Sequence, residues 1–212
     1  APNDPLFSAQ WALKNTGQNQ GTAGIDINYL PAREVTQGSS DIIVAVLDHG
    51  TQLDHPDLNV SSKSYDTETG RSPSQIWGNH GTACSGIISA KTNNNLGVAG
   101  IAPNCPVMSI SNQLMGTSDA PQKRADGFNW AWRNGASVIS NSWRSSTFSE
   151  LLEDAIQSAM TNGRNGLGCV VTFSAGNYDS NTVGYPARSL PDIIVVGALS
   201  LSGKRKSSTT ID

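Results

Sequence analysis

The sequence has little charge and no long apolar stretch. Charged residues make up 15% of the 212 positions and the formal net charge is −3, so no basic surface indicates nucleic-acid binding. No apolar run approaches the roughly 20 residues of a membrane-spanning helix, so we expect no membrane partner. Lys and Glu are sparse, which argues against a coiled coil, and a hydrophobic content of 37% argues against a disordered chain. These absences favour one folded globular domain.

Cysteine is also scarce. The three cysteines, Cys84, Cys105 and Cys169, are too few for a disulfide scaffold. One disulfide with one free thiol and three free thiols both agree with this number. The sequence starts at Ala1 without a signal peptide. Its composition, poor in charge and rich in Ser and Asn, favours a secreted protein whose signal has been removed.

Apolar runs alternate with segments of helical spacing. Residues 41–47 form a nearly continuous run of Ile and Val, which is typical of a strand buried on both faces of a parallel sheet. Such an alternation predicts an α/β fold in which helices flank a parallel sheet. Further strands are predicted at 107–110, 137–139, 169–173 and 193–196.

Residues 148–160 carry the clearest helical pattern. Their apolar side chains recur at intervals of three and four, which makes one stripe along a helix. Thr147 and Glu150 form a predicted capping box at its start, and Gly163 follows its end. Two more helices are predicted at about 122–133 and 80–90, and the Ser/Thr-rich stretch 61–74 is predicted as a surface loop.

Three polar side chains lie where functional groups gather in parallel sheets. Asp48 ends the first strand, His80 opens a helix of small residues, and Asn177 follows the strand at 169–173. Each has an ordinary alternative: a turn or N-cap Asp, a buried structural His, and a Gly-Asn turn. Together they supply a carboxylate to orient an imidazole, an imidazole to accept a proton, and an amide to donate to an oxyanion. This combination indicates acyl transfer.

Longer motifs run through nearly the whole chain in a fixed order. They are Asn3–Phe7 with Gln10-Trp11, Val46–Gly50, His55–Leu58, His80–Cys84, 94–100, Asn141–Trp143 and Phe173–Asn177. In these motifs the chain resembles the subtilisin-like serine proteases, and most closely their kexin-like (proprotein convertase) branch. The resemblance implies a subtilisin-type parallel sheet and peptide-bond hydrolysis.

The resemblance also implies roles for individual residues. It makes Asp48 the triad carboxylate, His80 the general base and Asn177 the oxyanion-hole donor. Cys84 matches a cysteine of the kexin-like branch and is expected to be a buried free thiol. An extended substrate is expected to pair with the segment around Ser142-Trp143. The expected cleft residues are Ser142, Trp143, Arg144, Ser174, Ala175 and Gly176.

Calcium is the cofactor that the resemblance implies. Kexin-like enzymes bind one calcium ion between two Asp residues and a loop after the His helix. Carboxylate, amide and carbonyl oxygens suit this ion, although the loop could also be an ordinary Asn-rich turn. The expected ligands are Asp4, Asp57 and Asn94 through side chains, and Lys91, Leu96 and Val98 through carbonyls.

The chain departs from the family in its nucleophile. The family places a serine well after the oxyanion-hole Asn, in a turn that leads into a helix, and no such motif follows Asn177. Ser207-Ser208 lies in a polar tail and too early. Residues 1–212 are therefore expected to be the N-terminal part of a subtilisin-like catalytic domain, incomplete at its C-terminal side and inactive alone. The expected partners are a C-terminal remainder with the serine and a β-rich domain, a propeptide or maturation chaperone, and a peptide or protein substrate.

Specificity is a further departure. The kexin-like branch favours basic residues before the cut and uses acidic side chains to bind them. Here Arg144 follows Trp143, and Val183 stands where an acid is expected, with only Asp179 acidic nearby. A basic preference is therefore a weak expectation. His49 replaces the family's usual Ser, Thr or Asp and is expected to point outward.

The sequence thus predicts a secreted serine endopeptidase with an Asp-His-Ser triad. A rival prediction from another class is a nucleophile-less module that only binds extended peptides. The retention of Asp48, His80 and Asn177 counts against the rival, because a binding module has no chemical need for all three. A serine in the continuation of the reading frame would decide between them.

Overall fold

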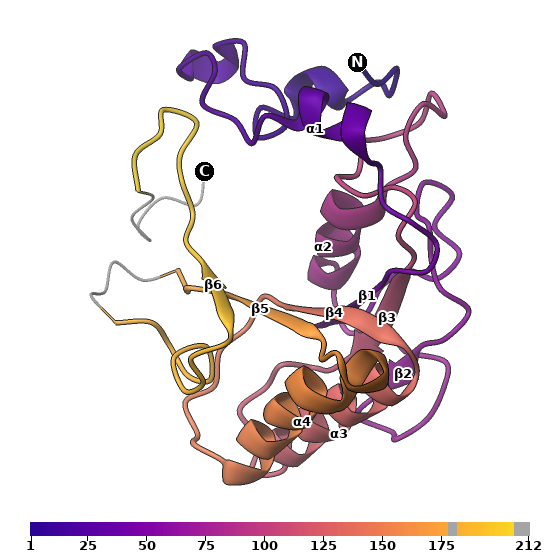
Figure 1. Cartoon of the computed structure of the whole chain (residues 1–212), viewed down its shortest axis with the longest axis vertical. Helices are drawn as coiled ribbons and strands as arrows, with labels where there is room; N and C mark the ends of the chain where they lie inside the picture. The colour runs from indigo at the N-terminus through magenta and orange to yellow at the C-terminus, as the bar shows by residue number, and fades with distance from the viewer. Residues whose placement is uncertain (178–181, 206–212) are drawn as a thin grey trace.

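The computed structural model describes residues 1–177 and 182–205. Its centre is a six-stranded sheet in the order β2-β3-β1-β4-β5-β6, and every neighbouring pair runs parallel (Figure 1). The predicted α/β fold with a parallel sheet flanked by helices is confirmed. The strands are β1 (Ile43–Asp48), β2 (Tyr65–Asp66), β3 (Val107–Ser111), β4 (Ala136–Asn141), β5 (Val170–Ser174) and β6 (Ile194–Val196). The helices are α1 (Tyr29–Val35), α2 (His80–Ser89), α3 (Ala120–Arg133) and α4 (Glu150–Gly166), with short 3-10 turns at Phe7–Ala9 and Gln18–Gln20.

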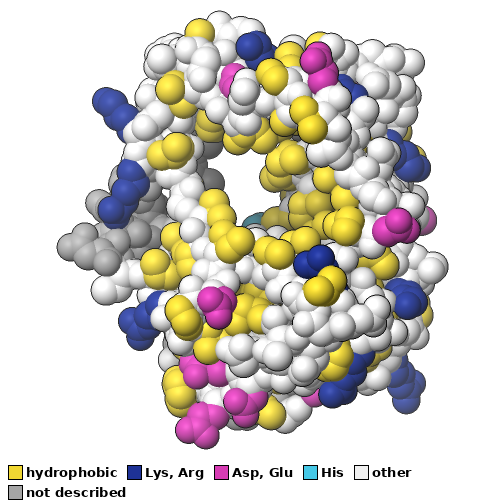
Figure 2. Space-filling model, in the orientation of Figure 1, with side chains coloured by type: hydrophobic (Ala, Val, Ile, Leu, Met, Phe, Trp, Pro, Cys, Tyr) yellow, Lys and Arg dark blue, Asp and Glu magenta, His cyan; other side chains and the backbone are white. Residues whose placement is uncertain are grey.

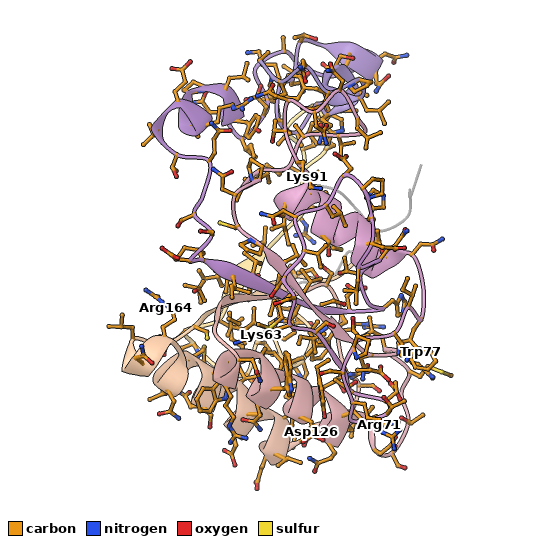
Figure 3. The ribbon with its side chains drawn as sticks, turned by 90° about the vertical axis from the view of Figure 1, so that its right-hand side faces the viewer. Lys63, Arg71, Trp77, Lys91, Asp126 and Arg164 are labelled. Atoms are coloured by element: carbon orange, nitrogen blue, oxygen red, sulfur yellow. The ribbon has the colours of Figure 1, made fainter. Side chains whose placement is uncertain are left out.

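Helices cover the two faces of the sheet unequally. α3 and α4 pack together beneath β1, β4 and β5, whereas α2 lies on the opposite face against β1 and β3 (Figures 1 and 3). All three residues of β6 are exposed, with Ile194 at 51% and Val196 at 57%. Figure 2 shows hydrophobic side chains bordering the opening between the sheet and the N-terminal segment. Since strands of a parallel sheet are normally buried on both faces, β6 lacks part of its cover.

The main core lies between the sheet and the pair α3–α4. Ala45 and Leu47 of β1 belong to this core, and Val44 and Val46 are also buried, as the continuous apolar run predicts. The Phe173 ring of β5 contacts the Trp143 ring edge-to-face, with centroids 5.0 Å apart. No helix among the described residues has the length and apolar character to cross a membrane.

The predicted helix at 148–160 is confirmed, but its predicted cap is wrong. The helix begins at Glu150, and Ser149 caps it by accepting a hydrogen bond from the Leu152 amide at 3.3 Å. Thr147 lies in a turn closed by its own amide, which donates to Ser145 Oγ. Gly163 leaves the helical conformation at φ −58° and ψ 161°, so the regular α-helix stops there.

The predicted surface loop at 61–74 contains β2, which the sequence analysis missed. Tyr65 pairs with Ile110 and Asp66 with Ser111 of β3. Asp66 is fully buried and accepts hydrogen bonds from the side chains of Thr69, Trp77 and Ser111. Within the predicted loop, Thr69 thus helps to satisfy this buried carboxylate.

Candidate active site

Three neighbouring strands end level with one another. Leu47 of β1 pairs with Asn141 of β4, and Asn141 pairs with Phe173 of β5. The next residues along the chain, Asp48, Ser142 and Ser174, therefore lie side by side at the carboxyl edge of the sheet. The structure brings together the ends of the strands that the sequence analysis singled out.

Asp48 and His80 form a hydrogen-bonded pair at this edge. The His80 Nδ1 atom lies 2.8 Å and 2.9 Å from the two carboxylate oxygens of Asp48. The Asp48 side chain is 1% exposed, whereas that of His80 is 52% exposed. The His49 amide also donates to Asp48, at 2.7 Å. With Nδ1–H donating to the carboxylate, Nε2 on the half-exposed ring remains to accept a proton.

The start of α2 is held close to the end of β1. Ser85 Oγ lies 2.7 Å from Thr51 Oγ1, and both side chains are fully buried. Gly81 packs directly on the backbone of Gly50, where a side chain would not fit. The small residues of α2 thus bring His80, its first residue, within reach of Asp48.

Two further side chains lie beside His80. The His49 ring is half-buried and lies edge-to-face with the His80 ring, with ring centroids 6.2 Å apart. The expectation that His49 points outward is therefore wrong. Cys84 is a free, half-buried thiol with Sγ 3.7 Å from His80 Nδ1. Burial, followed by the Asp48 charge, raises the pKa of the Cys84 thiol. Asp48, His80 and Cys84 bring three possible metal-ligand atoms within 4.8 Å of one another, but the Asp48–His80 hydrogen bond already uses two of these side chains.

The other two cysteines lie away from this edge. Cys105 and Cys169 are both buried and both free. Of the two alternatives that the cysteine count allowed, three free thiols is therefore the one that the structure shows. Burial raises the pKa of the Cys169 thiol to about 11.

Asn177 leaves the same edge through the turn at Ser174–Gly176. Gly176 has a φ of 100°, a left-handed conformation that favours glycine, and the Ala175 amide donates to the Val196 carbonyl of β6. Asn177 itself is exposed. Its role as an oxyanion donor stays a prediction, and Asp179 lies outside the described residues.

The expected substrate segment divides into exposed and buried parts. Ser142 and Arg144 are exposed, whereas Trp143 is 7% exposed and packs into the core. Only the backbone of Trp143 can therefore face a substrate. A hollow of about 490 Å³ lies beside this segment, and the charged residues that line it within the described chain are Arg144 and Arg188. Val183 lines this hollow where the sequence analysis looked for an acid.

The residues of the expected calcium site meet in one place. The carboxylate of Asp4 accepts hydrogen bonds from the amides of Asn93 and Asn94, and that of Asp57 accepts from the Asn94 side chain at 2.7 Å and the Val98 amide at 3.2 Å. Asp4 and Asp57 are each 3% exposed. Neither carboxylate has an ion-pair partner among the described residues.

This donor set fits a divalent cation. No hydrogen bond made within the described chain ends on the carbonyl oxygens of Lys91, Leu96 or Val98. Two buried carboxylates that share one loop make a negatively charged, oxygen-rich site of the kind that calcium prefers, and the three carbonyls stay predicted ligands. Asn94 differs from the expectation, because its amide nitrogen faces Asp57 and its Oδ1 accepts from the Leu96 amide. Its side-chain amide must turn over before the oxygen can serve as a ligand.

Sequence reasoning missed two residues that the fold brings to the cleft. Arg188 follows β5 by a long loop, and Arg124 lies on α3 with its side chain buried against Trp143. A charged residue within a helical pattern is usually solvent-exposed. No local signal in the sequence shows that Arg124 faces inward.

Comparison with known proteins agrees with this geometry. Residues 39–212 match the Subtilase family. A calcium-dependent protease of Nostoc sp. is 32% identical over 95% of the chain, and a thermophilic serine proteinase of Bacillus sp. is 35% identical over 92%. Neuroendocrine convertase 2 of Homo sapiens is 32% identical over 86%. The chain spans 33%, 47% and 32% of the lengths of these three relatives.

A solved structure shows the same arrangement of elements. A protease of Pseudoalteromonas arctica superposes with a TM-score of 0.78 at 28% identity, covering 96% of this chain and 67% of that one. The relatives include both bacterial proteases and a convertase at similar identity, so they do not single out the kexin-like branch. The family match covers more than half of the sequence and agrees with the Asp48–His80 pair. The chain therefore belongs to the subtilase family.

Proposed function

We propose that residues 1–212 form the N-terminal part of the catalytic domain of a secreted serine endopeptidase. The observation that carries this proposal is the hydrogen bond between the half-exposed His80 ring and the buried Asp48 carboxylate. Burial of the Asp48 carboxylate costs free energy, so the pair is explained better by a role in proton transfer than by a contribution to stability. The match to proteases supports the same reaction class.

In this mechanism His80 Nε2 takes the proton of a serine hydroxyl as the serine attacks the scissile carbonyl carbon. Asp48 keeps the imidazole oriented and stabilises its cation, and the Asn177 side-chain amide donates to the developing oxyanion. His80 then gives the proton to the leaving amine. The backbone around Ser142 and Arg144 pairs with the extended substrate, and Ser174, Ala175 and Gly176 form the opposite wall.

The attacking serine is proposed to lie outside this sequence, on a C-terminal remainder of the same protein. The exposed face of β6 and the hydrophobic side chains around the opening in Figure 2 support this, because such surface is normally covered. The remainder is also proposed to include a β-rich domain. A propeptide or maturation chaperone is proposed as a folding partner.

Calcium is the proposed cofactor. Asp4, Asp57 and Asn94, with the carbonyls of Lys91, Leu96 and Val98, would hold it. When bound, the ion neutralises two buried carboxylates and ties the N-terminal segment to the loop after α2. Its role is structural, and no chemical step passes through it. The name of the Nostoc relative, a calcium-dependent protease, agrees with this proposal.

A preference for basic residues before the cut has no support in the described cleft. The charged side chains that line the hollow beside Ala175 are Arg144 and Arg188. A basic preference would require acidic groups from outside the described residues. Kexin-like specificity is therefore the weaker part of the proposal.

The test is peptide cleavage by the full-length protein and its His80→Gln variant. We expect the parent protein to cleave unstructured peptides and His80→Gln to lose at least about 10³-fold in kcat, with its thermal unfolding little changed. His55→Gln is the matched control and should keep its activity, because His55 caps a turn at the Asp57 amide. Peptide binding without cleavage by the parent protein would instead support the binding module.

A further inference from the structure

A second hollow lies across the substrate segment from the first. Its volume is about 210 Å³, and Arg144, Ser145 and Ser146 line both hollows. The far wall comes from the start of α3 and the loop before it. It consists of Leu114, Gly116, Thr117, Ala120, Pro121 and Arg124. No acidic side chain lines this hollow within the described chain.

Arg124 is the unusual member of this wall, because it is a cation that is almost fully buried. Its side chain is 2% exposed. The guanidinium lies over the Trp143 ring at 4.8 Å, and Nη2 donates to the Met115 carbonyl at 3.1 Å. Its Nε–H is buried and has no hydrogen-bond partner among the described residues.

No carboxylate of the described chain neutralises Arg124 directly. Glu68 is close enough to influence it electrostatically, but its oxygens are held by Lys123 at 2.7 Å and by the Gln113 amide at 2.9 Å. Asp119, at the start of α3, is paired with the same Lys123 at 2.9 Å. Burial lowers the pKa of the Arg124 guanidinium, which is the direction expected of a cation removed from water.

A buried cation with an unused donor is costly unless an anion meets it. An Arg side chain remains charged at all physiological pH values and binds carboxylates through paired N–H donors. The hollow is therefore suited to a carboxylate on a short side chain. The contact of Arg124 with the Trp143 ring does not give the Arg124 Nε–H a hydrogen-bond acceptor.

The position of the hollow links it to the substrate. The segment Arg144–Ser146 separates it from the larger hollow beside Ala175 and Gly176. An extended peptide that pairs with this segment passes over both hollows. Its side chains alternate in direction along the strand, so side chains at different positions can reach the two hollows.

We propose that the Arg124 hollow is a side-chain subsite that selects an acidic residue of the substrate, at a position other than the one next to the cut. This subsite deepens the proposed endopeptidase function and rests on it. Arg124 is then a specificity-determining residue, and the carboxylate of the substrate side chain pairs with the guanidinium that lines the hollow.

The test uses the full-length protein and a series of peptides in which Glu is moved through the positions before the cut, each compared with Gln. We expect the ratio of kcat/KM for Glu over Gln to reach about 10- to 100-fold at one position, since that is the usual gain of a charge-assisted hydrogen bond. Arg124→Met should bring this ratio to about 1, and Arg124→Lys should reduce it because Lys lacks the planar fork.

Arg133→Met is the matched control, because Arg133 also lies on α3 and stacks on a Trp ring at 5.1 Å but is exposed and outside the hollow. It should keep the Glu preference. A ratio near 1 at every position of the unaltered protein overturns the subsite while leaving the endopeptidase function intact, and so does a preference that persists in a folded Arg124→Met variant. If no peptide is cleaved, the endopeptidase proposal fails instead. Calorimetric binding of the Glu and Gln peptides then decides the subsite, and equal affinity overturns it.

Discussion

Gly81 lies so closely against the backbone of Gly50 that Gly81 cannot carry a side chain. A Cβ built on Gly81 would be 2.4 Å from the Gly50 carbonyl oxygen and 2.9 Å from its nitrogen. This contact joins the first turn of α2 to the turn after β1. His80 precedes Gly81 and Asp48 lies two residues before Gly50, so the close approach sets the separation of the proton-transfer pair.

We therefore expect Gly81→Ala to disturb both stability and catalysis. The added methyl group would push α2 from β1 and cost about 1–3 kcal/mol, which lowers Tm by several degrees. The full-length variant should also lose kcat, because His80 moves from Asp48. Gly86→Ala is the matched control on the same helix, where the nearest atom to the new Cβ is 4.0 Å away. It should raise stability by about 0.5–1 kcal/mol. Equal effects of the two substitutions, measured by calorimetry and peptide hydrolysis, would contradict this interpretation.

Replacement of Asp48 by Asn should abolish most of the activity without unfolding the protein. An amide in place of the carboxylate favours the wrong tautomer of His80, and the loss in kcat is expected to be about 10⁴-fold. Asp66→Asn is a suitable control, because Asp66 is also a buried, hydrogen-bonded carboxylate at the end of a strand but pairs with Thr69 and Trp77. It should lower Tm and leave kcat within a few-fold. A small loss in kcat for Asp48→Asn would show that the Asp48 carboxylate does not orient His80.

The sequence predicted the strands of the sheet better than the details around them. Short apolar runs rich in Ile and Val located β1, β3, β4, β5 and β6, because such runs are typical of strands in a parallel sheet. The two-residue β2 was missed because its stability comes from pairing with β3 and from side chains that satisfy Asp66. The cap of α4 was misplaced by two residues because Thr147 and Ser149 have similar capping ability, and the turn at Ser145 decides between them.

The residues of the candidate site were predictable where they lie within motifs of the family. Asp48 and His80 follow from their motifs, and their hydrogen bond agrees with that assignment. The burial of Trp143 and of Arg124 was not predictable, since Trp143 packs on Phe173 of β5 and Arg124 packs on Trp143. Local patterns do not contain such contacts.

Calcium should stabilise the protein through Asp4 and Asp57. At a free calcium concentration 100 times Kd, the expected gain is about 2.7 kcal/mol, seen as a higher Tm that a chelator reverses. Asp57→Asn should remove most of this gain, whereas Asp54→Asn, an exposed neighbour, should retain it. An unchanged response to calcium in Asp57→Asn would place the ion elsewhere.

Cys84 should react slowly with alkylating reagents at neutral pH. Only the thiolate reacts, and burial together with the Asp48 charge raises the pKa of this thiol, so its alkylation should rise with pH to a midpoint above the roughly 8.5 of a free cysteine. Asp48→Asn should lower that midpoint. Cys105 and Cys169, at 4% and 6% exposure, should stay unlabelled in the folded protein and serve as internal controls. Rapid labelling of Cys84 at pH 7, read by peptide mass spectrometry, would contradict the assigned environment.

The most direct test of the account is labelling of the full-length protein with a fluorophosphonate, which attaches to an activated serine. We predict a single adduct, on a serine outside residues 1–212, whose rate of formation falls by orders of magnitude in His80→Gln. Thermal unfolding of the variant would confirm that it is folded. An adduct on a serine within residues 1–212, or no adduct on a folded full-length protein, would contradict the proposed triad.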